Sequence, residues 1–254
     1  MDKKQLFEFL ENYTLKYNQI EFIENDPIQI PHQFTVKEDI EIAGFLAANI
    51  AWGQRPVIIR NANKLMELMD FAPHDFIMNA VHSDLKVFEG FKHRTFQSVD
   101  IQFYIESLQH IYRNYGGLEK VFEEGFKENA KKALVDFNRL FFSIPHLSRT
   151  EKHVSNPERN SAAKRLNMFL RWMIRKDDKG VDFGLWKNCS PAQLMLPLDV
   201  HTGRIGRGLG LLERKQNDWK AVEEITKNLR LFDKSDPIKY DFALFGYGVN
   251  EKYT

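Results

Sequence analysis

Apolar residues recur at helical spacing along most of the chain. Leu6, Leu10 and Tyr13, for example, lie four and three positions apart, which is the period of one face of an α-helix. The same pattern predicts helices over residues 3–18, 37–51, 57–70, 98–114, 117–127, 129–142, 161–175, 200–209, 218–230 and 237–248. Strand-like alternation of apolar and polar residues is scarce, so the sequence predicts an all-α fold.

Irregular stretches separate these helices. Gly53 and Pro56 disfavour continuation of the helix over 37–51. The segment 143–160 is polar with two prolines and predicts a loop, and 177–190 has no regular pattern. We expect one domain over residues 1–254, divided into a helical lobe of 36–145 and a second lobe of 1–35 plus 146–254.

The composition is that of a protein with a large core. The chain has 254 residues, including 21 Phe, 8 Tyr and 4 Trp, which is enough to bury a core without disulfides or metal. Cys189 is the only cysteine. An intrachain disulfide, a four-cysteine zinc site and a cysteine-bound iron–sulfur cluster are therefore excluded, and we expect neither a metal nor a cofactor.

The first residues carry charges throughout and contain no apolar signal core, and no stretch is long and apolar enough to span a membrane. We therefore expect a soluble, cytoplasmic protein without a membrane partner. The formal net charge is +1, but the segment 156–176 holds six Lys and Arg residues against one acid, Glu158. Such a window marks either an anion site or a solvated helix face.

The segment "SAAKRLNMFLRWMIRK" combines two stripes at helical spacing. One stripe is apolar and holds Ala163, Leu166, Leu170, Met173 and Ile174; the other is basic and holds Lys164, Arg171 and Arg175. Lys164 falls in the first turn, where the helix end is already positive. It is either a flexible surface lysine or a cation compensated there by an anion or a carboxylate.

The segment "LPLDVHTGRIGRGLG" places one acid, Asp199, at the start of a short helix, where Asp is a favoured N-cap. Asp199 is either an ordinary cap or an ionised acid facing a partly dry cleft. Arg204 and Arg207 share a face and suit phosphate contact. The glycines follow no strand, so we reject a dinucleotide site, and Asp199 with His201 is too small a set for a metal site.

The residues of this segment carry a resemblance. "LPLDVHTGRIGRGLGL" resembles the catalytic segment of the helix-hairpin-helix DNA glycosylase superfamily, which includes the relatives of endonuclease III and 8-oxoguanine glycosylase. "AKRLNMFL", "DPIKYDFALFGYG" and "EIAGFLAANIAWGQRP" resemble three further family segments. Within the superfamily, "KRLNMFLRWMIR", "VDFGLW" and "LPLDVHTGRI" resemble a bacterial branch described only as a domain of unknown function.

The resemblance implies a two-lobed glycosylase-like fold with a cleft between the lobes, and double-stranded DNA with a damaged base as the partner. It matches Asp199 to the family's catalytic carboxylate and Lys164 to its nucleophile, which implies base excision with Schiff-base lyase chemistry. The residues expected to contact DNA are Arg171, Arg175, Arg204, Arg207 and Gln54, the last in the loop that relatives insert into duplex DNA. Candidates for holding an extruded base are Phe183, Trp186 and Phe242, for which core packing is the alternative.

The sequence also departs from the family. The family's L-P-G-V-G hairpin, whose amides grip a phosphate, is replaced by "NPERNSAAK", and the spacing between Lys164 and Asp199 is longer because of residues 177–193. No cysteine cluster follows the last helix, so only the cluster-free version applies. Three functions stay open: a DNA glycosylase, a non-catalytic DNA-binding module on the same fold, and an α-helical scaffold or enzyme that acts on another anionic ligand.

Overall fold

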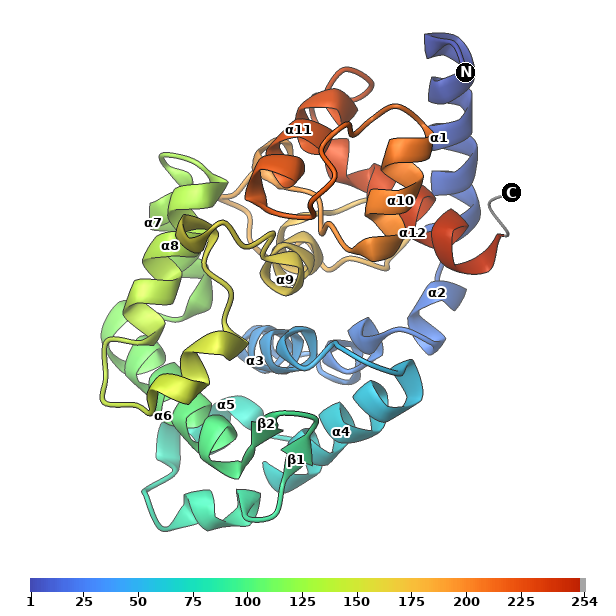
Figure 1. Cartoon of the computed structure of the whole chain (residues 1–254). Helices are drawn as coiled ribbons and strands as arrows, with labels where there is room; N and C mark the ends of the chain where they lie inside the picture. Colours follow the sequence, from blue (N-terminus) through green and yellow to red (C-terminus); the bar gives the residue numbers. More distant parts are fainter. Residues whose placement is uncertain (252–254) are drawn as a thin grey trace. The chain divides into compact units, whose positions relative to one another are not determined.

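The computed structural model describes residues 1–251, which are mostly helical (Figure 1). The α-helices are α1 (Lys3–Tyr17), α2 (Glu21–Glu24), α3 (Lys37–Asn49), α4 (Arg55–Leu68), α5 (Pro73–Asn79), α6 (Ser98–Tyr115), α7 (Leu118–Phe126), α8 (Ala130–Phe141), α9 (Lys164–Ile174), α10 (Val200–Gly208), α11 (Trp219–Leu229) and α12 (Tyr240–Asn250). The short 3-10 helices are η1 (Pro27–Gln29), η2 (Pro31–Gln33), η3 (Asp84–Phe88), η4 (Ser148–His153), η5 (Pro157–Arg159), η6 (Pro191–Gln193) and η7 (Pro237–Lys239).

Strand structure is confined to one small hairpin. β1 (Lys92–His93) pairs antiparallel with β2 (Phe96–Gln97), and these two strands form the only sheet within residues 1–251. The prediction of an all-α fold is thus confirmed. None of the helices in this part of the chain is long and apolar enough to cross a membrane.

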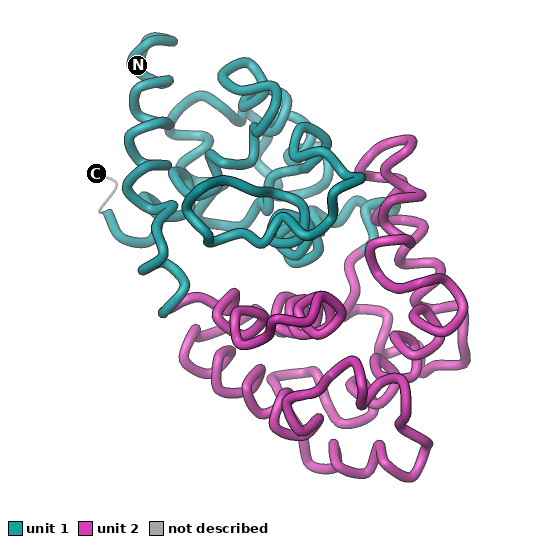
Figure 2. Tube along the Cα trace, turned by 180° about the vertical axis from the view of Figure 1, so that it is seen from behind, with its two compact units in different colours: residues 1–24, 156–254 teal, residues 25–155 magenta. Residues whose placement is uncertain are grey.

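The chain divides into two compact units (Figure 2). Unit 1 consists of residues 1–24 and 156–254, and unit 2 of residues 25–155. The sequence had placed the boundaries of the inner lobe at residues 36 and 145, inside unit 2. Both chain ends belong to unit 1, in which the last helix, α12, packs against the first helix, α1.

In unit 1, α12 packs against both α1 and α10. Leu10, Ile205 and Leu244, one from each helix, are fully buried. Gly246 allows the close approach of α1, because a Cβ at this position would overlap the ring of Tyr17. The packing brings the N-terminus of α10 and the first half of α12 into the same region as α9.

Unit 2 has an aromatic core. Phe45 of α3 packs against Tyr104 of α6 and against Phe137 and Phe141 of α8, with ring centroids 5.5–5.9 Å apart. All four side chains are buried, and edge-to-face and tilted aromatic pairs of this kind add to the stabilisation from burial. The many phenylalanines of the sequence therefore serve the core of this unit.

Several helix boundaries differ from the predicted ones for local reasons. α9 begins at Lys164 rather than at 161, because Ala163 adopts a left-handed conformation with φ 46° and ψ 37°. α4 begins at Arg55 because Pro56, which lacks an N–H, is tolerated in a first turn. The predicted loop 143–160 contains η4 and η5, and neither α5 nor the β1–β2 hairpin was predicted.

Candidate active site

Lys164 is the first residue of α9, and its side chain is 27% exposed. The preceding segment is fastened to the start of α11: the Trp219 N–H donates to the Asn160 carbonyl at 3.3 Å, and the Asn160 side chain donates to Asp218 at 3.0 Å. These contacts and the left-handed Ala163 fix where α9 starts. The segment before α9 is thus held in place by the start of α11.

Asp199 is the N-cap of α10, as the sequence predicted. Its Oδ1 accepts hydrogen bonds from the backbone N–H groups of His201 at 2.8 Å and Thr202 at 3.0 Å. Thr202 Oγ1 in turn accepts from the Asp199 N–H at 2.8 Å, which completes a capping box. The Asn217 side chain donates to the Asp199 carbonyl at 2.9 Å, so the backbone and one carboxylate oxygen are both held.

The two candidate residues meet at the surface of unit 1. Lys164 Nζ lies 3.9 Å from Asp199 Oδ2, and their side chains are 27% and 20% exposed. Leu196 and Leu198, just before Asp199, are buried, whereas Val200 after it is exposed. Asp199 therefore lies where the chain leaves the core. Its Oδ1 caps α10, and its Oδ2 faces the amine of Lys164.

A second carboxyl group, that of Asp241 in α12, is buried in unit 1 and acts electrostatically on both candidate residues. Arg171 Nη1 donates to Asp241 Oδ2 at 2.5 Å, and the Asp241 side chain is 7% exposed. Burial raises the pKa of Asp241 to about 6, with the charge of Asp199 acting in the same direction and those of Arg171 and Lys164 acting against it. Asp241 was not among the residues predicted for the site, although an acid within the apolar run of "YDFALFG" was a signal.

Arg171 and Arg175 are core residues rather than surface cations. They are 4% and 2% exposed. Arg171 pairs with Asp182 at 3.2 Å and with Asp241, and Arg175 pairs with Asp177, Asp182 and Asp236 at 2.8–3.0 Å. Burial opposes the charge of Arg175, but the three carboxylates outweigh it and raise its pKa. We therefore withdraw both arginines from the set expected to contact DNA.

The residues suggested for an extruded base lie mostly in the core. Trp186 and Phe242 are each 1% exposed. The Phe242 ring packs under Arg171, with 4.5 Å between the guanidinium carbon and the ring centroid, and Trp186 meets Phe169 edge to face at 5.5 Å. Phe183 is half-buried. Core packing, the alternative considered for these residues, accounts for Trp186 and Phe242.

Of the other residues expected to contact DNA, Arg204 is exposed, and its Nη2 donates to the Gly248 carbonyl at 2.9 Å. Arg207 is half-buried and donates to the carbonyls of Arg214 and Lys215, both at 2.8 Å, and to Asn217 at 2.6 Å. Gln54 is exposed at the start of α4 in unit 2. Arg204 thus keeps an accessible charge in unit 1, whereas Arg207 fastens the loop that carries Asn217.

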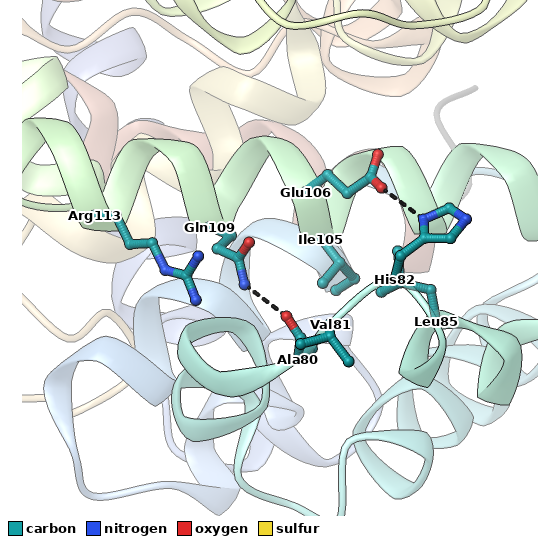
Figure 3. Close-up of a pocket in the computed structure, with 8 residues that line it drawn as sticks. All are labelled: Ala80, Val81, His82, Leu85, Ile105, Glu106, Gln109 and Arg113. Atoms are coloured by element: carbon teal, nitrogen blue, oxygen red, sulfur yellow. Dashed lines mark hydrogen bonds and ion pairs between the residues drawn. The ribbon is translucent and has the colours of Figure 1, made fainter.

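A cavity of about 360 Å³ lies in unit 2, beside α6 (Figure 3). It is lined by Ala80, Val81, His82, Leu85, Ile105, Glu106, Gln109 and Arg113. Gln109 donates to the Ala80 carbonyl at 3.0 Å, and His82 Nδ1 lies 3.4 Å from Glu106. These contacts fasten the segment after α5 to α6, and no residue predicted for the site lines the cavity. Within residues 1–251, no three His, Cys, Asp or Glu side chains gather to hold a metal ion.

The molecule is thus an all-α protein in which one of two compact units carries a lysine and an aspartate at two helix starts, together with a buried carboxyl group on a third helix. The chain belongs to the family described as a protein of unknown function (DUF2400), which matches residues 26–250 and so includes Lys164, Asp199 and Asp241. No curated protein and no solved structure matches the chain.

Proposed function

We propose that the protein is a DNA glycosylase that excises a damaged base and forms a Schiff base with the sugar. The observation that carries the proposal is the 3.9 Å separation of Lys164 Nζ and Asp199 Oδ2 at the starts of α9 and α10. It is supported by the resemblance of both segments to the helix-hairpin-helix glycosylases. The proposal includes the finer assignment of a two-lobed glycosylase-like fold with a cleft.

The roles follow from the chemistry of an N-glycosidic bond. As the bond between C1′ and the base breaks, the electron pair leaves with the base and positive charge develops on the sugar. Asp199, held in place by its capping box, stabilises this charge as an anion. Lys164 as a neutral amine attacks C1′, and opening of the sugar ring then gives the Schiff base.

DNA contact in the proposal rests on exposed groups. Arg204 on α10 offers a cation five residues after Asp199, and Gln54 stands at the exposed start of α4. Arg171 and Arg175 no longer contribute, so fewer phosphates are contacted than the basic segment 156–176 suggested. We therefore expect duplex affinity to depend only moderately on salt concentration.

Base release from a panel of duplexes, each with one damaged base, tests the proposal. Asp199→Asn should lower the rate by about 10²–10³-fold, because it removes the stabilising charge. Asp2→Asn is the matched control, since Asp2 caps α1 with a capping box as Asp199 caps α10. No release by the parent on any duplex would refute catalysis, and retained duplex binding would then favour the non-catalytic DNA-binding module.

A further inference from the structure

The turn of the β1–β2 hairpin in unit 2 contains a residue that its backbone geometry disfavours. Arg94 and Thr95 join the two strands, whose last pair is His93 with Phe96. Arg94 has φ 55°, a left-handed conformation in which a side chain strains the backbone and for which turns use glycine, asparagine or aspartate. Because Arg94 is also exposed, packing in the core does not account for an arginine here. Strain that is kept at an exposed position indicates a use for the guanidinium itself.

The Arg94 guanidinium lies over the loop between α3 and α4. Its central carbon is 5.8 Å from the centroid of the Trp52 ring. The next residue, Gly53, has φ 111°, and a Cβ at this position would come within 3.0 Å of Arg94 Nη1. The loop therefore makes room for the guanidinium by having no side chain at this point. Gln54, the exposed residue that relatives insert into duplex DNA, follows directly in the chain.

Other residues fasten the hairpin turn, so Arg94 is not needed for that purpose. His93 Nε2 lies 3.1 Å from the carbonyl oxygen of Trp52, which ties the turn to the α3–α4 loop. From the other side, Arg149 of η4 donates to the Thr95 carbonyl at 3.0 Å. The guanidinium of Arg94, by contrast, makes no hydrogen bond or ion pair with any residue in the range 1–251. A polar ligand can therefore reach its N–H groups.

Two further exposed cations stand on the segments that meet at this loop. Lys92 is in β1, two positions before Arg94. Lys152 is in η4, beside His153, whose ring meets the Trp52 ring edge to face at 5.8 Å. Among the described residues, neither lysine forms an ion pair with an acid. These three residues, which we call the hairpin cations, thus carry positive charge that no ion pair neutralises, as in a surface that attracts a polyanion.

We propose that the hairpin cations bind backbone phosphates of duplex DNA beside Gln54, with Arg94 as the principal contact. A guanidinium donates two parallel N–H bonds to the oxygens of one phosphate, and its packing on Trp52 lowers the side-chain entropy that binding costs. The closely spaced charges of a duplex backbone suit cations that stand on separate segments. The inference rests on the proposed function for its ligand, and it adds a contact in unit 2, whereas Lys164 and Asp199 belong to unit 1.

The test is the affinity of the full chain for a duplex with one abasic site, measured by fluorescence anisotropy at salt concentrations from about 50 to about 200 mM. Arg94→Gly should weaken binding about tenfold at the lowest salt and reduce the slope of log affinity against log salt by about 1. Its thermal midpoint should stay within about 4 °C of the parent's, because relief of the strained φ offsets the lost packing on Trp52. Arg94→Lys keeps the charge and should keep the slope.

Two control variants separate the effect of the guanidinium from those of backbone and net charge. Phe71→Gly relieves the same kind of strain in the same unit, since Phe71 is exposed and has φ 52°. Lys131→Gln removes a positive charge from an exposed position on α8, also in unit 2. Both variants should bind the duplex like the parent.

The outcomes separate this inference from the proposed function. Equal affinity and slope for the parent and Arg94→Gly would overturn the role of Arg94 and leave the proposed function standing. An equal loss in Lys131→Gln would overturn it as well, because any cation of unit 2 would then serve. If Arg94→Gly alone loses affinity but the parent releases no base, the DNA contact stands and catalysis fails. A parent that binds no duplex overturns both.

Discussion

The amine of Lys164 and the carboxylate of Asp199 stand 3.9 Å apart, each at the start of a helix, and each side chain is about a quarter exposed or less. A partly exposed ion pair at this distance contributes no more than about 1 kcal/mol to stability. Neither α9 nor α10 needs the other's charge for its own cap. The pairing thus has little structural value, which favours a role in chemistry.

Replacing Lys164 should therefore change stability little. We expect Lys164→Gln to shift the free energy of unfolding, measured by urea denaturation, by less than about 1 kcal/mol. Lys220→Gln, at an exposed position on α11, is the control and should behave alike. A loss above about 3 kcal/mol in Lys164→Gln alone would mean that the lysine is a structural residue.

The free energy of unfolding should depend on pH in the way that titration of Asp241 predicts. Its pKa is raised from 3.8 to about 6 by burial, so the folded state binds this proton more tightly than the unfolded state. Asp241 therefore contributes stability at low pH that is lost as pH rises from about 4 to about 6. We expect the difference in free energy of unfolding, parent minus Asp241→Asn, to fall by about 3 kcal/mol over this window and to stay constant above pH 7. A difference that is flat from pH 4 to pH 7 would contradict the raised pKa.

Removal of the charge should weaken DNA binding at Arg204 and lower stability at Arg175. Arg204→Ala should weaken duplex binding and reduce the slope of log affinity against log salt by about 1, with little loss of stability. Arg175→Ala leaves the buried Asp182 without one of its two arginines and should cost about 3–5 kcal/mol of stability. Fluorescence anisotropy with a duplex and urea denaturation measure the two effects. An Arg204→Ala variant that binds duplex like the parent would remove α10 from the interface.

The contact between α1 and α12 should not tolerate a side chain at Gly246. A methyl group there would overlap the Tyr17 ring, so we expect Gly246→Ala to cost about 1–3 kcal/mol. In a Tyr17→Ala background the same substitution should cost much less, because the overlapping ring is gone. Equal costs in the two backgrounds, measured by thermal unfolding, would show that the helices do not approach closely at this point.

The sequence predicted the parts of the structure that local rules decide. The helical spacing of Leu6, Leu10 and their counterparts gave the all-α class, and the position of Asp199 gave its role as the cap of α10, because both follow from neighbours a few residues away. The stripe of Lys164, Arg171 and Arg175 was identified as a basic face on the same basis.

Tertiary packing decided the rest. Arg171 and Arg175 are buried because Asp182, Asp236 and Asp241, from a loop and from another part of the chain, fold over them, and the spacing within α9 holds no information on those partners. Asp241 was missed for the same reason. Its partner Arg171 lies 70 positions before it in the sequence.

The central claim is that Lys164 forms a covalent bond with the sugar beside Asp199, and borohydride trapping to a duplex with one abasic site at pH 7 tests it most directly. We expect the parent and Lys220→Gln to give a covalent protein–DNA adduct, and Lys164→Gln to give none. Peptide mapping of the adduct should place the DNA on Lys164. Absence of an adduct with the parent, or an undiminished adduct with Lys164→Gln, would contradict the account.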